Sequence, residues 1–184
     1  EQRIDLANSY VIGDRDTDIQ FAENLKLSGF KMGGGSGSNW RDIASLILDK
    51  PRCAQVERKT NETNICISVN LDNDRPITVQ TGIGFFDHML EQVIMHAGIS
   101  ASIIVKGDLD IDDHHTVEDT AIVFGSAIKS ALSDKLGIAR YGFVLPMDES
   151  TAAVNLDLSG RSYCEFKCDF NSERIGDLST EMIG

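Results

Sequence analysis

Strands with one buried face are predicted wherever apolar and polar side chains alternate along the chain. Residues 65–71 and 77–79 alternate in this way, and the polar segment 72–76 between them has turn chemistry. We therefore expect these two strands to pair as a hairpin. Further strands are expected at 101–106, 143–146, 152–158 and 163–169.

Helices are predicted where apolar side chains recur every three or four residues. Two long ones are expected at 86–97 and 114–135, the second with Gly137 as its C-terminal cap, and a new helix begins near Asp177. The order of elements thus restarts after the long helix, and Val69-Asn70-Leu71-Asp72 recurs as Val154-Asn155-Leu156-Asp157. Internal duplication and chance both remain open as explanations of this echo.

The first third of the chain has its own organisation. A strand at 9–14 and a helix at 17–27 precede the Gly-rich stretch 33–38, whose composition is typical of a flexible linker. The stretch lacks the Gly-Lys-Ser/Thr ending of a phosphate-binding loop. A short helix at 40–48 should end before Pro51. We therefore expect three parts, residues 1–32, a linker with its helix at 33–51, and a main domain at 52–184.

Composition excludes several classes of protein. The 184 residues, 41% of them hydrophobic, suffice for a buried core. The net charge of -12 has the wrong sign for holding nucleic acid, and no apolar run approaches the roughly 18 residues of a membrane span. The four cysteines form no Cys-x-x-Cys pair, so we expect reduced, structural thiols in a cytoplasmic protein.

Three of the four histidines, His88, His114 and His115, lie beside acidic residues. At the start of a helix, His114 and Glu118 share one face because they are four residues apart, so they can bind one metal ion. His115 points about 100° away and would serve a second ion. Zinc, manganese, iron and nickel all suit such ligands. Three ligands cannot complete two coordination shells, so further ligands are expected from elsewhere.

A less specific interpretation is that Asp112 or Asp113 caps the helix while the histidines decorate a solvated first turn. The helix at 86–97 favours a functional surface, because its expected core face consists of Leu90, Val93, Ile94 and Ala97. The opposite side could receive a substrate or a neighbouring subunit, and it carries His88, Glu91, Gln92 and His96.

Residues 82–90 (Gly-Ile-Gly-Phe-Phe-Asp-His-Met-Leu) and 112–119 (Asp-Asp-His-His-Thr-Val-Glu-Asp) resemble signature segments of imidazoleglycerol-phosphate dehydratase. The resemblance extends from about Arg52 to the end, through residues 59–63, 140–142, 146–149, 159–161 and 176–182. It implies an α/β (α+β) fold, a duplicated half-domain with helices on one face of a four-stranded sheet, with the second half incomplete.

The resemblance also implies two manganese ions between the subunits of a homo-oligomer, each held by three histidines and one glutamate. Carried over to this chain, His88 and His115 would serve one ion, and His114 and Glu118 the other. The implied reaction removes water from imidazoleglycerol phosphate to give imidazoleacetol phosphate in histidine biosynthesis. Metal bound to the ring nitrogens would stabilise negative charge on the imidazole, so the hydroxyl would leave before a proton is lost.

Further site residues follow from the same resemblance. Glu62 is the candidate for proton transfer, and the planar guanidinium groups of Arg140 and Arg161 are the candidates for the phosphate. The four metal ligands would take part in catalysis. All of them would contact the substrate together with Glu62, Glu91, Gln92, His96, Arg140 and Arg161.

The first 32 residues resemble the closing portion of a histidinol-phosphatase of the haloacid-dehalogenase-like class, through residues 11–18. A bifunctional parent protein is implied. Asp14 and Asp18 would bind magnesium in that class, but the nucleophilic Asp-x-Asp segment has no counterpart in this chain, so phosphatase activity is not expected.

The chain starts at Glu1 and stops at Gly184, and we expect both ends to be truncated. A second His and a second His-His-x-x-Glu segment of the family have no counterpart here. The chain alone is therefore expected to have incomplete metal sites and little or no dehydratase activity. Two alternatives stand beside the lyase, a histidinol-phosphate phosphatase and a non-catalytic module whose metal ions hold subunits together.

Overall fold

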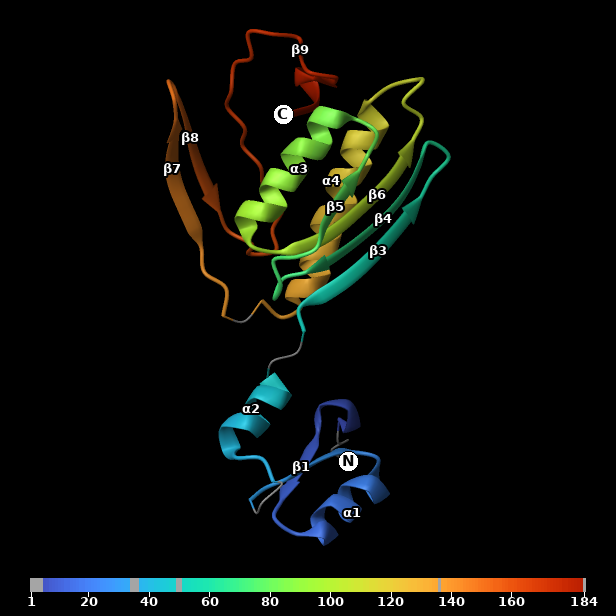
Figure 1. Cartoon of the computed structure of the whole chain (residues 1–184), viewed down its shortest axis with the longest axis vertical. Coiled ribbons are helices and arrows are strands. Elements are labelled where there is room, and N and C mark those ends of the chain that lie inside the picture. Colours follow the sequence, from blue (N-terminus) through green and yellow to red (C-terminus); the bar gives the residue numbers. More distant parts are fainter. Residues whose placement is uncertain (1–4, 34–36, 49–50, 136, 184) are drawn as a thin grey trace. The chain divides into compact units, whose positions relative to one another are not determined.

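A computed structural model describes residues 5–33, 37–48, 51–135 and 137–183 of the chain. It divides the chain into two compact units, residues 1–50 and 51–184 (Figure 1). The second unit begins next to Arg52, where the main domain is expected. Residues 34–36 of the Gly-rich stretch lie outside the described residues, as does Gly184, so the linker and the boundary expected there stay predictions.

The first unit holds a strand, a helix and a second strand. The strands β1 (Tyr10–Gly13) and β2 (Ser28–Lys31) pair in parallel, and the helix α1 (Asp16–Leu25) connects them. A further helix, α2 (Trp40–Leu48), occupies the range expected for it. A 3-10 turn at Leu6–Asn8 precedes β1. The parallel pair needs the helical connection, because a tight turn can join only antiparallel strands.

The second unit is built on a mixed four-stranded sheet of β3 (Cys53–Lys59), β4 (Thr63–Asn70), β5 (Ile77–Gln80) and β6 (Ser100–Gly107). Across the sheet the strand order is β3-β4-β6-β5. Adjacent strands run antiparallel from β3 to β6, whereas β5 runs parallel to β6 at the edge.

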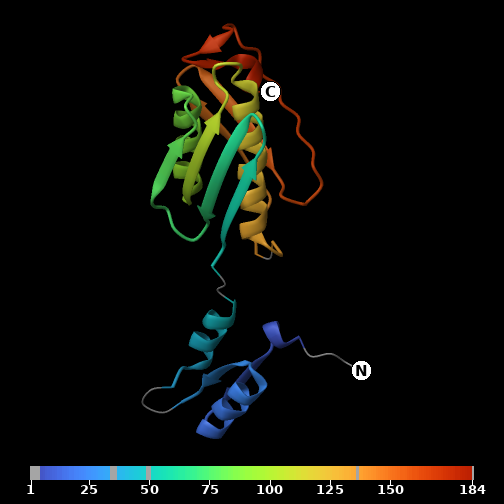
Figure 2. The ribbon, with the colours of Figure 1, turned by 90° about the vertical axis from the view of Figure 1, so that its right-hand side faces the viewer.

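Two helices, α3 (Gly84–Ala97) and α4 (His114–Leu132), cover one face of this sheet (Figure 2). Alternate positions of β4 and β6 point toward them, and Ile67 pairs with Ile103 at the centre, where both are fully buried. The expected fold class, helices on one side of a four-stranded sheet, is confirmed. The shared core consists mainly of Ile65, Ile67, Val69, Val79, Leu90, Ile94, Ala101, Ile103, Val105, Val123, Phe124 and Ala127.

The expected hairpin between residues 65–71 and 77–79 is wrong. β6 lies between β4 and β5, and β4 forms its hairpin with β3 instead. The turn of that hairpin is closed by the N–H of Thr60, which donates to the carbonyl of Thr63 at 2.9 Å. The sequence pattern did not predict β3, because its only aliphatic side chains, Ala54 and Val56, are followed by three charged residues and the alternation is too short.

The long helix α4 is shorter than expected. It ends at Leu132 rather than at Lys135, because Ser133 has a φ of 50° and so leaves the helical conformation. Gly137 has a φ of 79° but lies beyond the helix end and does not cap it. No helix in the described ranges combines the length and the apolar character that crossing a membrane requires.

The core face of α3 is narrower than expected. Leu90 and Ile94 are buried, but Val93 is 52% exposed and Ala97 is exposed as well. The helix packs mainly on the edge strand β5. Only the side of α3 that carries Leu90 and Ile94 therefore faces the core.

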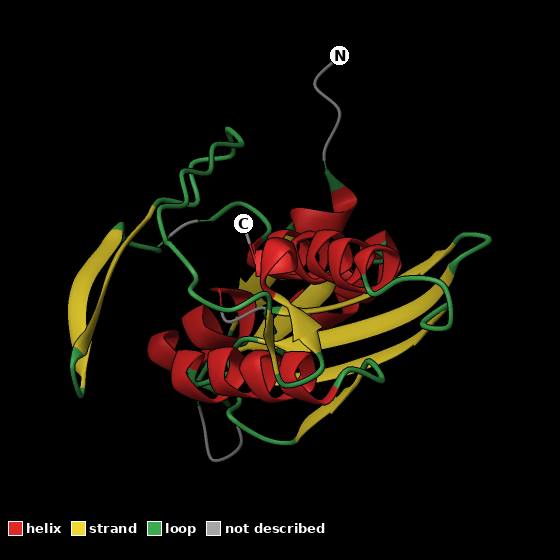
Figure 3. Cartoon of the chain, turned by 90° about the horizontal axis from the view of Figure 1, so that it is seen from above, coloured by secondary structure: helices red, strands yellow, loops and turns green. Residues whose placement is uncertain are grey.

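A second hairpin, β7 (Tyr141–Met147) and β8 (Ser150–Leu156), follows α4 and stands apart from the sheet (Figures 1 and 3). Both strands are exposed along their whole length. Residues 163–169 form no strand, and Cys164 and Cys168 are exposed, so the half-buried strand expected there is wrong. Alternation alone cannot form a strand without a neighbour that pairs with it.

The β7–β8 hairpin repeats a feature of the β3–β4 hairpin. Arg52, just before β3, donates through Nε to Asp72, and Arg140, just before β7, donates through Nε to Asp157. Asp72 and Asp157 are the final residues of the two matching tetrapeptides. The same ion pair therefore closes the same type of hairpin twice, which favours duplication over chance.

The last described residues form a small antiparallel pair, β9 (Arg174–Ile175) and β10 (Leu178–Ser179), followed by a 3-10 helix at Thr180–Ile183. An α-helix beginning near Asp177 is therefore wrong. Asp177 lies in the turn between the two strands, beside Gly176, whose φ of 61° suits glycine.

Replacing Ile103 by Ala should lower the free energy of unfolding by about 2–5 kcal/mol, because the side chain is fully buried and leaves a cavity. Urea unfolding followed by circular dichroism measures this, since the single tryptophan, Trp40, belongs to the other unit. Val144→Ala, at a side chain that is 66% exposed, is the control and should change stability little. Equal losses in the two variants would contradict the position of the core.

Candidate metal and substrate site

The N-terminal turns of α4 carry two side chains, His114 and Glu118, whose potential metal-binding atoms lie next to each other. His114 and Glu118 are four residues apart, and His114 Nε2 lies 2.9 Å from Glu118 Oε2. Both side chains are more than half exposed to solvent. The carboxylate of Asp112 accepts a hydrogen bond from the N–H of His114 at 2.8 Å, which keeps the pKa of Asp112 below its usual value. The helix start is thus capped, and His114 and Glu118 still share one face.

His115 points to a different partner. Its Nδ1 lies 3.2 Å from both carboxylate oxygens of Asp108, in the loop before α4. The rings of His114 and His115 are nearly perpendicular, at 85°, with centroids 5.9 Å apart. The divergence expected from helix geometry is therefore present. If Nδ1 carries the hydrogen that Asp108 accepts, Nε2 keeps a lone pair free for a metal ion.

Glu62 lies within electrostatic reach of His115. The hydrogen bond to Asp108 raises the pKa of His115, and the charges of Asp108, Glu62 and Asp112 raise it further, against the opposing effect of desolvation. Glu62 is held in the β3–β4 turn, where its N–H donates to Thr60 Oγ1 at 3.1 Å. The structure thus brings the candidate for proton transfer to the same end of the sheet as His115.

One side chain of α4, Asp119, holds that turn against the helix. Thr63 Oγ1 donates to Asp119 at 2.6 Å, and Arg58 forms an ion pair with the other oxygen of Asp119 at 2.9 Å. Asp119 is one residue beyond Glu118, on the side of α4 that faces the sheet. This contact keeps the β3–β4 turn, and with it Glu62, against the start of α4.

The polar side of α3 is open to solvent. His88, Glu91 and His96 are exposed, and Gln92 is partly buried. His88 contacts the ring of Phe85, with centroids 6.3 Å apart. Within the described residues no hydrogen bond or ion pair joins His88 to the α4 ligands, so the pairing of His88 with His115 stays a prediction.

The donor atoms fit a divalent transition metal, because imidazole nitrogen together with carboxylate oxygen suits ions of the manganese-to-zinc series. His114 and Glu118 could hold one ion, and His115 and His88 are the candidates for another. Among the residues that the structure describes, however, no three His, Cys, Asp or Glu side chains gather as a metal-binding group. A complete coordination shell would need ligands beyond those brought together here.

The two phosphate candidates line one hollow. Arg140 and Arg161 border a cavity of about 820 Å³ beside the β7–β8 hairpin, together with Asp157 and Tyr163. Arg140 is paired with Asp157 at 2.9 Å, so an anion would have to compete with that carboxylate for its guanidinium group. The structure brings these two arginines together but shows no contact between them and the described histidines.

The magnesium candidates lie in the first unit. Asp14 follows β1 and is exposed, and Asp18 lies in the first turn of α1. The Asp18 carboxylate lies close against the end of β1. A Cβ at Gly13 would come within 2.2 Å of Asp18 Oδ2. The same carboxylate accepts the N–H of Arg15 at 3.1 Å. Magnesium binding by Asp14 and Asp18 stays a prediction.

Asp108 is a site residue that the sequence interpretation missed. Asp108 lies seven residues before His115, but the segment between Asp108 and α4 is a loop, so helical periodicity does not relate the two side chains. Asp177 was missed as well, since it lies 92 and 93 residues from its partners Phe85 and Gly84. The only signal in the sequence was a dense run of acidic residues before His114, which does not tell one carboxylate from another.

Fold and site together define an α/β protein with a candidate metal centre at the start of a helix. The family model of imidazoleglycerol-phosphate dehydratase matches residues 81–184. A crystal structure of imidazoleglycerol-phosphate dehydratase from Staphylococcus aureus is 34% identical, covers 71% of this chain and 72% of that chain, and has a TM-score of 0.63. The chain belongs to the imidazoleglycerol-phosphate dehydratase family.

Longer relatives match nearly the whole chain. The histidine biosynthesis bifunctional protein HisB of Buchnera aphidicola is 51% identical over 181 residues, which is 98% of this chain and 51% of that protein. The protein of the same name from Stenotrophomonas maltophilia is 48% identical over 186 residues, 100% of this chain and 52% of that protein. The chain thus spans about half the length of these curated relatives.

Replacing Asp108 by Asn should lower the pKa of His115 toward its ordinary value of 6.5, because the hydrogen-bonded carboxylate that stabilises the imidazolium is removed. Ring-proton NMR titration of the metal-free protein measures this. A raised pKa means that the pair stabilises the fold fully below pH 6.5 and that this contribution disappears as the pH rises through the pKa of the folded state.

Asp110→Asn is the matched control, since Asp110 lies in the same loop and does not contribute to the shift at His115. The pKa of His115 should stay raised in that variant. If Asp108→Asn leaves the titration of His115 unchanged, the contact between these two side chains does not exist in solution.

Proposed function

We propose that this chain is part of a manganese-dependent hydro-lyase that removes water from imidazoleglycerol phosphate to give imidazoleacetol phosphate in histidine biosynthesis. The meeting of His114 Nε2 and Glu118 Oε2 at 2.9 Å, beside a His115 held by Asp108, carries the proposal. Membership of the dehydratase family and the names of the longer relatives support the reaction.

The proposed ligands divide between two ions, His114 with Glu118 and His115 with His88. A bound Mn²⁺ would act as a Lewis acid on the imidazole ring of the substrate, which lowers the cost of negative charge there. Asp108 fixes the ring orientation of His115. The remaining ligands would come from outside the described residues, and a second subunit of a homo-oligomer is the proposed source.

Glu62 is proposed to move the proton. It lies in the β3–β4 turn near His115, is exposed, and can reach a substrate bound at the start of α4. On α3, Glu91, Gln92 and His96 are proposed to contact the substrate from the polar side of that helix. These roles require a substrate between α3 and α4.

Arg140 and Arg161 are proposed to bind the phosphate. Two guanidinium groups on one cavity of about 820 Å³ suit a dianion, because planar donors can each form paired hydrogen bonds with its oxygens. Release of Arg140 from Asp157 would accompany binding. Arg161 also lines a hollow with Lys129 and Leu132, at the end of α4 that is remote from His114, so these arginines are proposed to bind the phosphate of a substrate held by another subunit of the homo-oligomer.

The 184-residue chain should bind Mn²⁺ weakly, and His114→Ala should reduce that affinity at least about tenfold by removing one of two donors. Electron paramagnetic resonance of free Mn²⁺ measures the affinity. His96→Ala is the control, an exposed histidine on a helix that is not a proposed metal ligand. Equal loss in both variants would show nonspecific binding and count against the metal site.

An assay of dehydratase turnover distinguishes the lyase from a non-catalytic module whose metal ions only hold subunits together. The chain alone should show little or no water loss from imidazoleglycerol phosphate in the presence of Mn²⁺. A chimera, in which this chain replaces the aligned half of the Stenotrophomonas relative, should be active and should lose activity on chelation. Rapid turnover by the chain alone would refute the expectation that its metal sites are incomplete.

Within the active chimera, Glu118→Gln should lower kcat at least about a hundredfold, because a metal ligand loses its charge. Glu57→Gln, an exposed glutamate on β3 outside the proposed site, is the control and should keep the parent rate. If Glu118→Gln is as active as the control, Glu118 is not a ligand of the catalytic metal.

A further inference from the structure

The turn between β9 and β10 contacts the start of α3. Asp177 Oδ2 accepts the N–H of Gly84 at 2.6 Å, and Oδ1 accepts the N–H of Phe85 at 2.8 Å. The residue before the helix, Ile83, offers no side-chain cap of its own. Asp177 thus satisfies two helix N–H groups that would otherwise lack an intrahelical partner. These two donors hold the pKa of Asp177 below its usual value.

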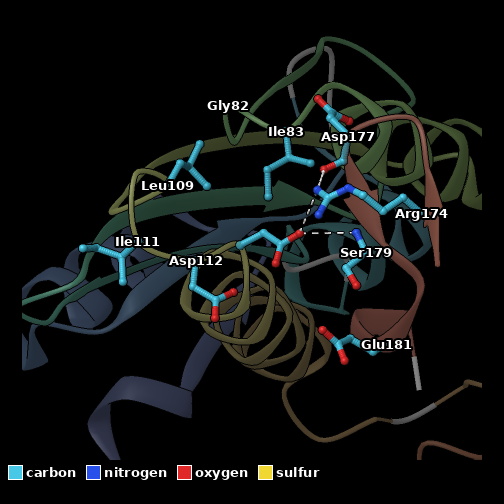
Figure 4. A pocket seen from close by; sticks show the side chains of 10 residues that line it. Gly82, Ile83, Leu109, Ile111, Asp112, Arg174, Asp177, Ser179 and Glu181 are labelled. Carbon is cyan, nitrogen blue, oxygen red and sulfur yellow. Dashed lines mark hydrogen bonds and ion pairs between the residues drawn. The ribbon is translucent and has the colours of Figure 1, made fainter.

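The same short segment also contacts the start of α4. Asp113 is the N-cap residue of that helix, yet its carboxylate makes no capping hydrogen bond to its own helix. It accepts the N–H of Ser179 at 3.3 Å and forms an ion pair with Arg174 at 3.5 Å. Arg174 also donates to the carbonyl of Asp177. Figure 4 shows Arg174 and Ser179 reaching toward the loop that carries Asp112, at the edge of a cavity of about 440 Å³.

Apolar packing and two glycines hold the segment close. Leu178 is buried in a small cluster with Ile83, at the start of α3, and Val117, in the first turns of α4. A Cβ at Gly176 would come within 3.2 Å of the Phe85 Cβ, and the φ of 61° at this position disfavours any other residue. A Cβ at Gly84 would come within 3.3 Å of Asp177 Oδ2. Both sides of the contact are therefore shaped for close approach.

The two helices pack mainly on different strands, α3 on β5 and α4 on β3 and β4. The segment Arg174–Ser179 contacts the N-terminal ends of both helices. Its own Asp177 accepts N–H groups of α3, and Asp113 at the start of α4 binds its Ser179. His88 lies one turn beyond Gly84, and His114 follows Asp113. The segment therefore lies where it can set the distance between the two groups of histidines.

We infer that Asp177 is a positioning residue: through Arg174–Ser179 it locks the N-terminal turns of α3 and α4 to each other, and so sets the placement of His88 relative to His114 and His115. The importance of this placement for catalysis rests on the proposed function. The lock itself does not, because it consists of contacts within this chain.

Histidine ring signals in NMR spectra of the metal-free chain test the lock at constant pH. In Asp177→Ala, the signals of His88 and of His114 and His115 should all shift, because loss of the α3 anchor also releases Ser179 and Arg174 from Asp113. Amide exchange of Gly84 and Phe85 should accelerate about tenfold as their acceptor is lost. Asp177→Asn keeps one acceptor oxygen and should shift the signals less.

Gly176→Ala keeps every charged group but pushes the segment away from Phe85, so it should shift the same histidine signals as Asp177→Ala. If Asp177→Ala does not fold, the spectra of Gly176→Ala test the lock instead. Glu181→Gln is the matched control, since Glu181 lines the same cavity without a hydrogen bond or ion pair to any described residue. Its ring signals should stay at their wild-type positions.

Shifts confined to His88, or equal shifts in Glu181→Gln, would overturn the inference. In the wild-type chain Mn²⁺ should bind at least threefold more tightly than in Gly176→Ala. If wild-type protein does not bind Mn²⁺ at all, the proposed metal function fails, while the ring signals still decide whether the lock exists.

Discussion

The pairing of β4 with β6 is the constraint on which the rest of the second unit depends. Ile67 faces Ile103 and Ile65 faces Val105 across this ladder, and all four side chains are buried on one face. Since side chains alternate between faces, a slip of one residue would turn this apolar set to solvent. With the ladder in register, α3 and α4 cover one face of the sheet, and the segment Arg174–Ser179 contacts the N-terminal turns of both helices.

The helix start of α4 then determines the chemistry available. Adjacent residues on a helix diverge by about 100°, and His114 and His115 accordingly face different partners. His114 meets Glu118 and His115 meets Asp108, which separates the two sets of donor atoms. Glu62 is placed near His115 by the β3–β4 turn, which Asp119 of α4 holds in place. The start of α4 thus carries three of the four metal candidates, His114, His115 and Glu118, and holds the proton-transfer candidate near them.

The ion pair at the β7–β8 hairpin includes one phosphate candidate, Arg140, and repeats an ion pair of the first hairpin. The ion pair of Arg140 with Asp157 repeats that of Arg52 with Asp72, at the same position of a hairpin. In the first hairpin the pair closes the end of a sheet that is complete. In the second the strands are exposed and a cavity opens beside the pair, so the same interaction lies where a phosphate could replace the carboxylate.

Much of this protein was determined by the sequence alone. The periods of 2 and 3.6 residues located β4, β6, α1 and α3, and the four-residue spacing of His114 and Glu118 was enough to predict that they share one face, because local geometry decides it. The tertiary structure alone decided which strands pair, since the β4–β5 hairpin was excluded by β6, and it alone revealed Asp108 and Asp177. These two carboxylates act across loops or across most of the domain, where no periodicity relates the partners. Local backbone geometry can be read from neighbours in the chain, whereas strand order and long-range capping depend on which surfaces the whole fold brings together.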